Sequence, residues 1–131
     1  MSTIFIHLNQ EKLDEQCRCL LTDAGEVAKK LVEKHNSPGD YTGVYYMLTA
    51  PIIQARWILD QIRAYGFDCL EPSWQQSAKL AVCVDYDELA VVFEELEPGS
   101  DEESIVEVAL ALKNLIVHST VGFSSPQEYD A

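Results

Sequence analysis

The chain has 131 residues, of which 47% are hydrophobic, and 22 acidic against 9 basic residues give it a formal net charge of −13. A chain of this size buries about two-thirds of the surface that it exposes when unfolded, so one domain with a core of its own is expected. The apolar content argues against disorder, and the acidity argues against nucleic-acid binding through a basic surface.

The N-terminal region predicts a strand followed by a helix. Residues 3–8 are a β-branched and aromatic run typical of a short strand. Asn9 is a favourable helix N-cap, and apolar residues recur at helical spacing after it. Gly25 leaves two alternatives open. Either one long helix runs through it, or a break precedes Asp23, which forms a capping-box-like pattern with Glu26.

The middle of the chain predicts a helix that begins at Pro51. Proline is favourable at a first helical position, where its missing N–H would be unpaired in any case. Apolar residues then recur at helical spacing as far as Gly66, which is typical of a helix end. Residues 41–49 fit a strand or the first turns of a helix. The apolar run 78–84 has no period and fits a buried strand or a buried helical turn.

Two further helices follow. Asp85 and Glu88 form a capping-box variant before a helix over 87–96, whose apolar stripe includes Val92. Ser100 and Glu103 form a standard capping box before a helix over 101–118. That helix is apolar around most of its circumference, so we expect it to be central.

These elements predict a mainly α fold. We expect a compact single-domain bundle of about five helices over 1–118, with a short N-terminal strand left open and a C-terminal tail over 119–131. The alternative is an α+β fold with strands near 3–8 and 78–84.

The negative charge is concentrated in the second half of the chain. Up to Phe67 there are 8 acidic and 7 basic residues, and after it there are 14 acidic and 2 basic residues. Residues 85–107 contain ten carboxylates and no Lys or Arg. Acidic first turns stabilise helices, and acidic surfaces keep proteins soluble. Alternatively, the carboxylates form one surface that attracts a basic partner.

The predicted partner-binding residues are these ten carboxylates and one tryptophan in a connecting segment, which is a candidate for an exposed anchor. They are Asp85, Asp87, Glu88, Glu94, Glu95, Glu97, Asp101, Glu102, Glu103, Glu107 and Trp74. Five aromatic residues, namely Tyr41, Tyr45, Tyr46, Trp57 and Trp74, either form a contact surface or fill the core.

Recognisable catalytic motifs are absent. The sequence has no glycine-rich nucleotide loop, no Gly-x-Ser-x-Gly elbow and no His-Glu-x-x-His. Cys17 and Cys19 do not have the spacing of a zinc knuckle. We therefore predict no enzyme activity, no metal and no cofactor. No apolar run approaches a membrane span and no secretory signal is recognisable, so a cytoplasmic protein with reduced cysteines and no membrane contact is expected.

We predict a small acidic binding protein that inhibits or neutralises a basic partner, such as a nuclease or another nucleic-acid-binding effector. Its carboxylates would replace phosphates without any direct binding of nucleic acid. Charge and size, though no motif, are similar to those of DNA mimics, anti-CRISPR and anti-restriction proteins among them, and of immunity proteins. The alternative is a helical structural or adaptor protein that forms homo-oligomers through an apolar face of helix 101–118.

Overall fold

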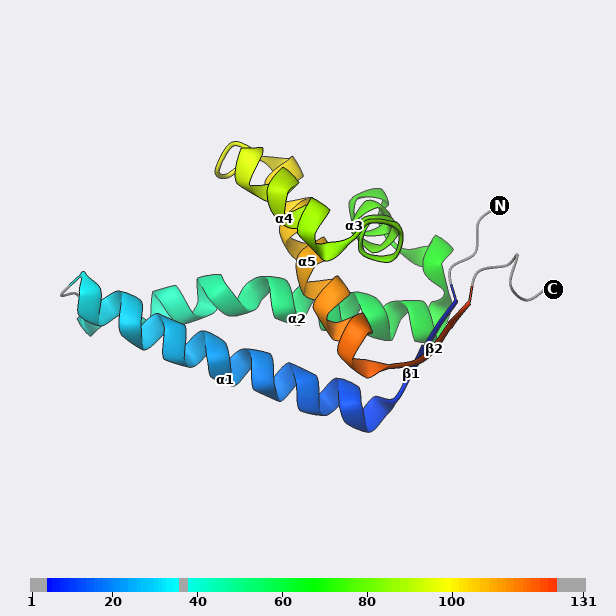
Figure 1. The fold of residues 1–131 in the computed structure, drawn as a ribbon, viewed down its shortest axis with the longest axis horizontal. Helices are drawn as coiled ribbons and strands as arrows, with labels where there is room; N and C mark the ends of the chain where they lie inside the picture. The colour runs from blue at the N-terminus through cyan, green and yellow to red at the C-terminus, as the bar shows by residue number, and fades with distance from the viewer. Residues whose placement is uncertain (1–4, 36–37, 125–131) are drawn as a thin grey trace.

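The computed structural model describes residues 5–35 and 38–124, and these form a mainly α fold, as predicted (Figure 1). The described residues contain five α-helices, two short strands and two single turns of 3-10 helix. In chain order they are β1 (Phe5–Leu8), α1 (Gln10–Lys34), η1 (Pro38–Asp40), α2 (Tyr41–Tyr65), η2 (Phe67–Cys69), α3 (Pro72–Cys83), α4 (Tyr86–Glu95), α5 (Asp101–Ser119) and β2 (Thr120–Ser124).

Helix α5 is the centre of the fold, as its apolar circumference predicts. It packs against α1, α2, α3 and α4. Its buried residues take part in two clusters. The larger one joins Leu112 and Leu115 to residues of α1, α2 and α3. The smaller one joins Val106 and Ala109 to Leu89 of α4. Helix α4 is therefore held by a smaller core than the rest of the molecule.

Helices α1 and α2 lie side by side along the long axis of the molecule (Figure 1). Helix α1 is continuous through Gly25, which settles the alternative that the sequence left open. A Cβ atom at Gly25 would lie 3.4 Å from the Tyr41 hydroxyl and 3.7 Å from the Tyr45 ring. These are ordinary contact distances, so Gly25 lies where α1 packs against these two stacked tyrosines of α2, and the space would also accept a Cβ atom.

The strand proposed at 78–84 is wrong, and with it the α+β alternative. Residues up to Cys83 belong to α3, which begins with proline at its first turn. Ser77, Ala78 and Ala81 are buried, at a spacing that places them on one helix face. The Ser77 hydroxyl donates a hydrogen bond of 2.9 Å to the Ile105 carbonyl of α5. Small residues therefore let α3 pack closely on α5, and residues 78–83 of the apolar run are helical with one buried face.

The helix start predicted at Pro51 is also wrong, because α2 begins ten residues earlier and Pro51 lies inside it. Proline cannot donate to the carbonyl four residues before it, and this weakens the local helix. Thr49 is buried and donates its hydroxyl to the Tyr45 carbonyl at 2.9 Å. Ala55 and Ile58, which follow Pro51 in α2, are buried where α2 packs against α1 and α5. Their burial outweighs the local loss of helix stability at Pro51.

The strand expected over 3–8 is found at Phe5–Leu8, and residues 3–4 lie outside the described part of the chain. It pairs with β2 in antiparallel fashion, with Leu8 opposite Thr120. The Asn9 amide also donates to the Ser119 carbonyl at 2.8 Å. Part of the segment expected to be a tail, Thr120–Ser124, thus forms a strand, and 125–131 lie outside the described residues.

Candidate partner-binding surface

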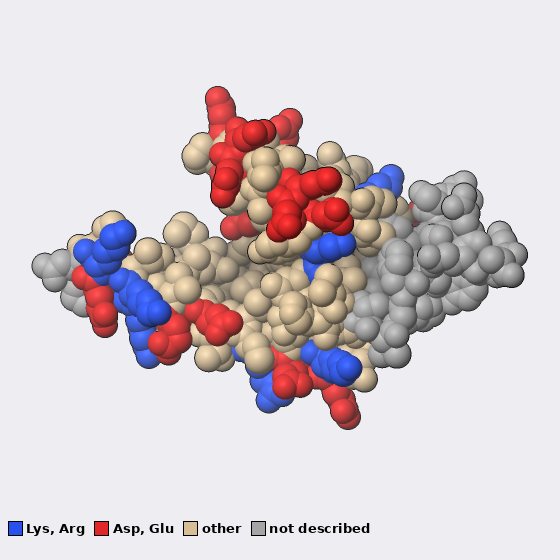
Figure 2. All heavy atoms as spheres, viewed as in Figure 1, with Lys and Arg blue, Asp and Glu red and all other residues tan. Residues whose placement is uncertain are grey.

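The ten predicted carboxylates lie on neighbouring elements that project to one side of the long axis of the molecule (Figure 1). We call this set the acidic surface. It consists of Asp85 before α4, Asp87, Glu88, Glu94 and Glu95 on α4, Glu97 in the following turn, and Asp101, Glu102, Glu103 and Glu107 on α5. Glu103 and Glu107 are half-buried, and the other eight residues are exposed. Figure 2 shows acidic atoms gathered over α4 and the α4–α5 turn, whereas both signs alternate along α1.

The acidic surface has no basic counterpart. In residues 5–35 and 38–124 the ion pairs join Lys29 to Glu26 and Arg56 to both Asp14 and Asp60. All of them lie on α1 and α2. None of the ten carboxylates therefore forms an ion pair with a residue in the described part of the chain. Like charges on neighbouring turns repel by a few tenths of a kcal/mol each.

Helix ends account for only part of the acidic surface. Asp87 and Glu88 lie in the first turn of α4, where the helix dipole favours negative charge. Glu94 and Glu95 lie in its last turn, which holds no basic residue. Negative charge at that end is unfavourable by about 0.3 to 1 kcal/mol per residue at low salt. Local helix stability explains the first pair and opposes the second.

The capping patterns that frame the surface behave differently from one another. Ser100 Oγ accepts the Glu103 amide at 3.1 Å, as predicted for a capping box. The Glu103 carboxylate accepts a hydrogen bond of 3.0 Å from the backbone amide of Gly99, whose φ is +84°. Asp85 is the N-cap residue of α4, as predicted, but its side chain makes no capping hydrogen bond. The Asp85 carboxylate is exposed and is not bonded to the helix backbone.

Two exposed valines lie among the carboxylates of α4. Val91 is 56% exposed and Val92 is 43% exposed. With Glu88 and Glu95 they follow the spacing of a single helix face, and Val91 and Val92 line a shallow depression of about 460 Å³ with Asp87 and Glu88. The apolar stripe predicted for this helix includes Val92, but Val92 lies on the exposed face of α4. The sequence signal for the exposure of Val92 is its position between Glu88 and Glu95, which place one charge at each end of this helix face.

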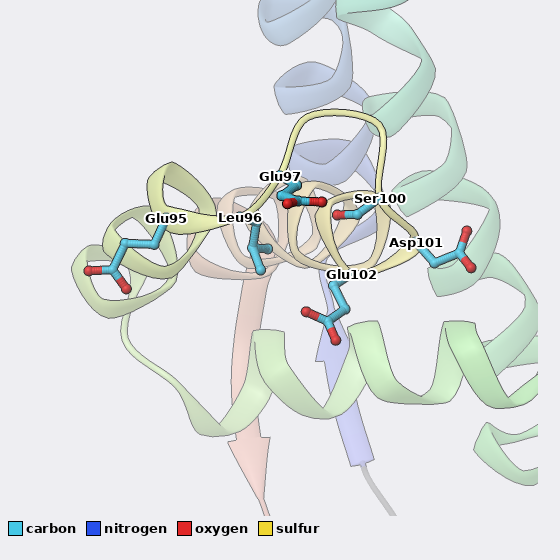
Figure 3. A pocket seen from close by; sticks show the side chains of 6 residues that line it. All are labelled: Glu95, Leu96, Glu97, Ser100, Asp101 and Glu102. Carbon is cyan, nitrogen blue, oxygen red and sulfur yellow. The ribbon is translucent and has the colours of Figure 1, made fainter.

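A second depression of about 490 Å³ lies over the α4–α5 turn and is lined by Glu95, Glu97, Asp101 and Glu102 together with Leu96 and Ser100 (Figure 3). Their carboxylates point in different directions and do not converge on a common point. Of the residues that the structure describes, no group of three or more His, Cys, Asp or Glu is placed to hold a metal ion. This arrangement suits several separate contacts with a large partner.

Trp74 lies at the border of this region. It is half-buried and packs on the larger core cluster, so it is not a fully exposed anchor. Its exposed part lines a depression of about 530 Å³ that also includes Asp101 and Ser104 at the start of α5. The fold therefore brings Trp74 close to one edge of the acidic surface, although 27 residues separate it from Asp101 in sequence.

The protonation equilibrium of Glu107 is shifted by its surroundings. Partial burial raises the pKa of its carboxyl above the ordinary value of 4.5, and the negative charge of Glu103 raises it further.

Comparisons with known proteins found no match among family models, curated proteins or solved structures. None of the described helices is long and apolar enough to cross a membrane.

Proposed function

We propose that the chain is a small acidic binding protein that occupies the nucleic-acid-binding surface of a basic partner and blocks it. The observation that carries the proposal is the position of Glu94, Glu95 and Glu97. They are exposed, lie at the unfavourable end of α4 or just after it, and form no ion pair with any residue that the structure describes. Neither helix stability nor ion pairing accounts for them.

The spacing of the carboxylates supports contacts with a row of basic side chains. Glu88 and Glu95 are seven residues apart on one face of α4, roughly 10 Å along the helix axis. Asp101 and Glu102 continue the negative charge onto α5. Lysine and arginine side chains that otherwise bind phosphates can form charge-assisted hydrogen bonds with such carboxylates. The negative electrostatic field of these carboxylates also increases the association rate with a positively charged partner.

The valines of α4 favour a protein partner over simple solvation. Protein interfaces typically combine an apolar centre with a polar rim. Val91 and Val92 are exposed in the middle of the α4 face, and Glu88 and Glu95 lie before and after them. Exposed valines at the centre of this surface do not improve the solubility of the chain, so solvation alone does not account for them.

The proposed setting is a reducing cytosol, and the proposed action is binding rather than catalysis. Cys17, Cys19, Cys69 and Cys83 are all free thiols in the structure, which suits such a compartment. The divergent carboxylates of the α4–α5 turn suit contact with an extended basic surface better than the activation of a small substrate.

The test is a pull-down from nuclease-treated host lysate with three immobilised baits. The first is the wild type. The second carries Glu88→Lys, Glu94→Lys, Glu95→Lys and Glu102→Lys in the acidic surface. The third is a matched control with Glu11→Lys, Glu15→Lys, Asp23→Lys and Glu33→Lys, all exposed positions on α1. Both variants have the same net charge, so they differ only in where the negative charge is removed.

We expect the wild type and the α1 variant to capture the same basic nucleic-acid-binding protein at low salt and to release it at high salt. The acidic-surface variant should not capture it. Equal capture by all three baits, or equal loss from both variants, would show that the location of the charge is irrelevant and would refute the proposal.

A further inference from the structure

Helix α2 exposes an apolar face that its own fold does not cover. Tyr46, Ala50, Ile53 and Trp57 recur at spacings of four, three and four residues, the pattern of a helix-pairing seam. Tyr46 is 65% exposed, Ile53 56% and Trp57 44%. Met47 lies beside the seam and is also exposed. The buried residues of α2, including Ala55 and Ile58, lie on the other side and pack in the core.

This face is also uncharged, in a molecule that carries a formal charge of −13. From residue 41 to residue 59 the only charged residue is Arg56. Its guanidinium lies 2.8 Å from the Asp14 carboxylate of α1 and 3.3 Å from that of Asp60. The one charge in this part of α2 is therefore neutralised at the α1 contact, away from the seam.

We propose that a second copy of this chain covers the seam, with the two α2 helices packed antiparallel about a two-fold axis. Two copies repel each other wherever their acidic surfaces approach. The first 67 residues carry 8 acidic and 7 basic residues, so contact through α2 brings together the nearly neutral halves. Figure 1 shows α4 projecting away from the long axis along which α1 and α2 lie.

The seam supplies a large part of the area that a stable dimer needs. At their exposed fractions, Tyr46, Met47, Ile53 and Trp57 together present roughly 500 Å². A standard interface buries about 800 Å² on each partner. Thr42, Gly43 and Ala50 along the same face are also exposed and add to the seam area.

The seam is also complementary to itself. In a two-fold interface, residue i of one copy contacts residue j of the other, and j contacts i. Antiparallel pairing centred between Ile53 and Gln54 brings Trp57 opposite Ala50 in two symmetric places. A large side chain then faces a small one in both layers, which is the arrangement that packs without a void.

The inference is independent of the proposed function, and salt separates the two. Binding of a basic partner weakens as salt rises, whereas dimerisation of two acidic copies tightens because repulsion is screened. Failure of one therefore does not imply failure of the other. If both hold, each dimer presents two acidic surfaces.

The test is the molar mass of the full chain by sedimentation equilibrium over a wide concentration range. The wild type should reach twice the chain mass of 14.7 kDa. Ile53→Glu and Trp57→Glu should stay at the single-chain mass, with at least a 100-fold weaker association and an unchanged helical circular dichroism spectrum. Val117→Glu, at a similarly exposed position on α5, is the control and should still dimerise.

A size swap tests the antiparallel pairing. Ala50→Trp alone should weaken the dimer by overfilling both layers, and the double variant Ala50→Trp with Trp57→Ala should restore it. A wild type that stays at the single-chain mass at every concentration overturns the proposal. A dimer that Ile53→Glu leaves intact also overturns the proposal. The antiparallel pairing is refuted if the double variant associates more weakly than Ala50→Trp alone.

Discussion

The pair formed by α1 and α2 and the region formed by α4 and the start of α5 differ in how their surface charge is balanced. Between α1 and α2, Arg56 binds Asp14 and Asp60, and its Nη1 donates to the Cys17 sulfur at 3.6 Å. Burial alone would lower the pKa of Arg56, but the hydrogen bonds to Cys17 and Asp14 and the nearby Asp60 charge raise it on balance. In the α4–α5 region no such cation is present among the described residues.

Charge therefore contributes to folding between α1 and α2, whereas at the end of α4 it opposes folding. The α4–α5 region is held by the small cluster of Leu89, Val106 and Ala109 and by the Ser100 cap, while its carboxylates repel one another. Glu94 and Glu95, in the last turn of α4, are the carboxylates that the proposed basic partner would compensate.

The largest effects are expected from the two cores. Leu115 is fully buried in the larger cluster, and Leu89 is 1% exposed in the smaller one. Leu115→Ala should lower the free energy of unfolding by about 3 to 5 kcal/mol, and Leu89→Ala by about 2 to 3 kcal/mol. Urea unfolding measures both values. Hydrogen exchange should show that Leu89→Ala loosens α4 selectively. Equal exchange in all helices would contradict a separate, weaker attachment of α4.

Arg56 tests the balanced region. Arg56→Met should lower the free energy of unfolding by about 1 to 2 kcal/mol, because a mostly buried cation is lost and Asp14 and Asp60 are left without their partner. Arg63→Met is the control. Arg63 is exposed and donates to Gln10, so its loss should change stability by less than about 0.5 kcal/mol. Equal effects would mean that the bridge between α1 and α2 is not stabilising.

Reversal of charge at the end of α4 should have the opposite sign. The double variant Glu94→Lys and Glu95→Lys should be more stable than the wild type by about 0.5 to 1 kcal/mol at low salt, because it removes repulsion and complements the helix dipole. The gain should shrink at about 0.5 M NaCl. Glu11→Lys, in the first turn of α1, should instead destabilise. Urea unfolding at two salt concentrations provides the measurement.

The smallest effect concerns Glu107. Since burial raises the pKa of this carboxyl, the folded chain retains a proton that the unfolded chain has already released at the same pH. The contribution of Glu107 to stability therefore falls as pH rises from the ordinary value of 4.5 through the raised one. Glu107→Gln should remove this dependence, and its stability relative to the wild type should grow across that window. A constant difference between the two proteins would contradict the assignment.

Sequence patterns predicted well what local chemistry determines. Asn9 caps α1 by accepting the Lys12 amide, Gly66 ends α2 with a φ of +91°, and Ser100 begins α5. Each is a backbone requirement that one residue type meets. The apolar circumference of residues 101–118 likewise predicted a central helix, since such a helix must be covered on all sides.

Sequence patterns failed where tertiary contacts outweigh local preference. Pro51 marks a helix start by local rules, but the tyrosines before it pack near Gly25 and extend α2 backwards. The run 78–84 has no visible period because small residues such as Ala78 and Ala81 fit a close contact between helices. The acidic surface was predictable as a set, whereas the exposed Val91 and Val92 within it depend on α4 having only a small core.

The central claim is that the acidic surface competes with nucleic acid for a basic partner. The most direct measurement is the fluorescence anisotropy of a labelled oligonucleotide bound to the captured partner, titrated with the wild type and with the two charge-reversed variants. We expect the wild type and the α1 variant to displace the oligonucleotide from the partner, and the acidic-surface variant to leave it bound. Displacement by all three, or binding of the wild type beside an undisturbed oligonucleotide, would contradict it.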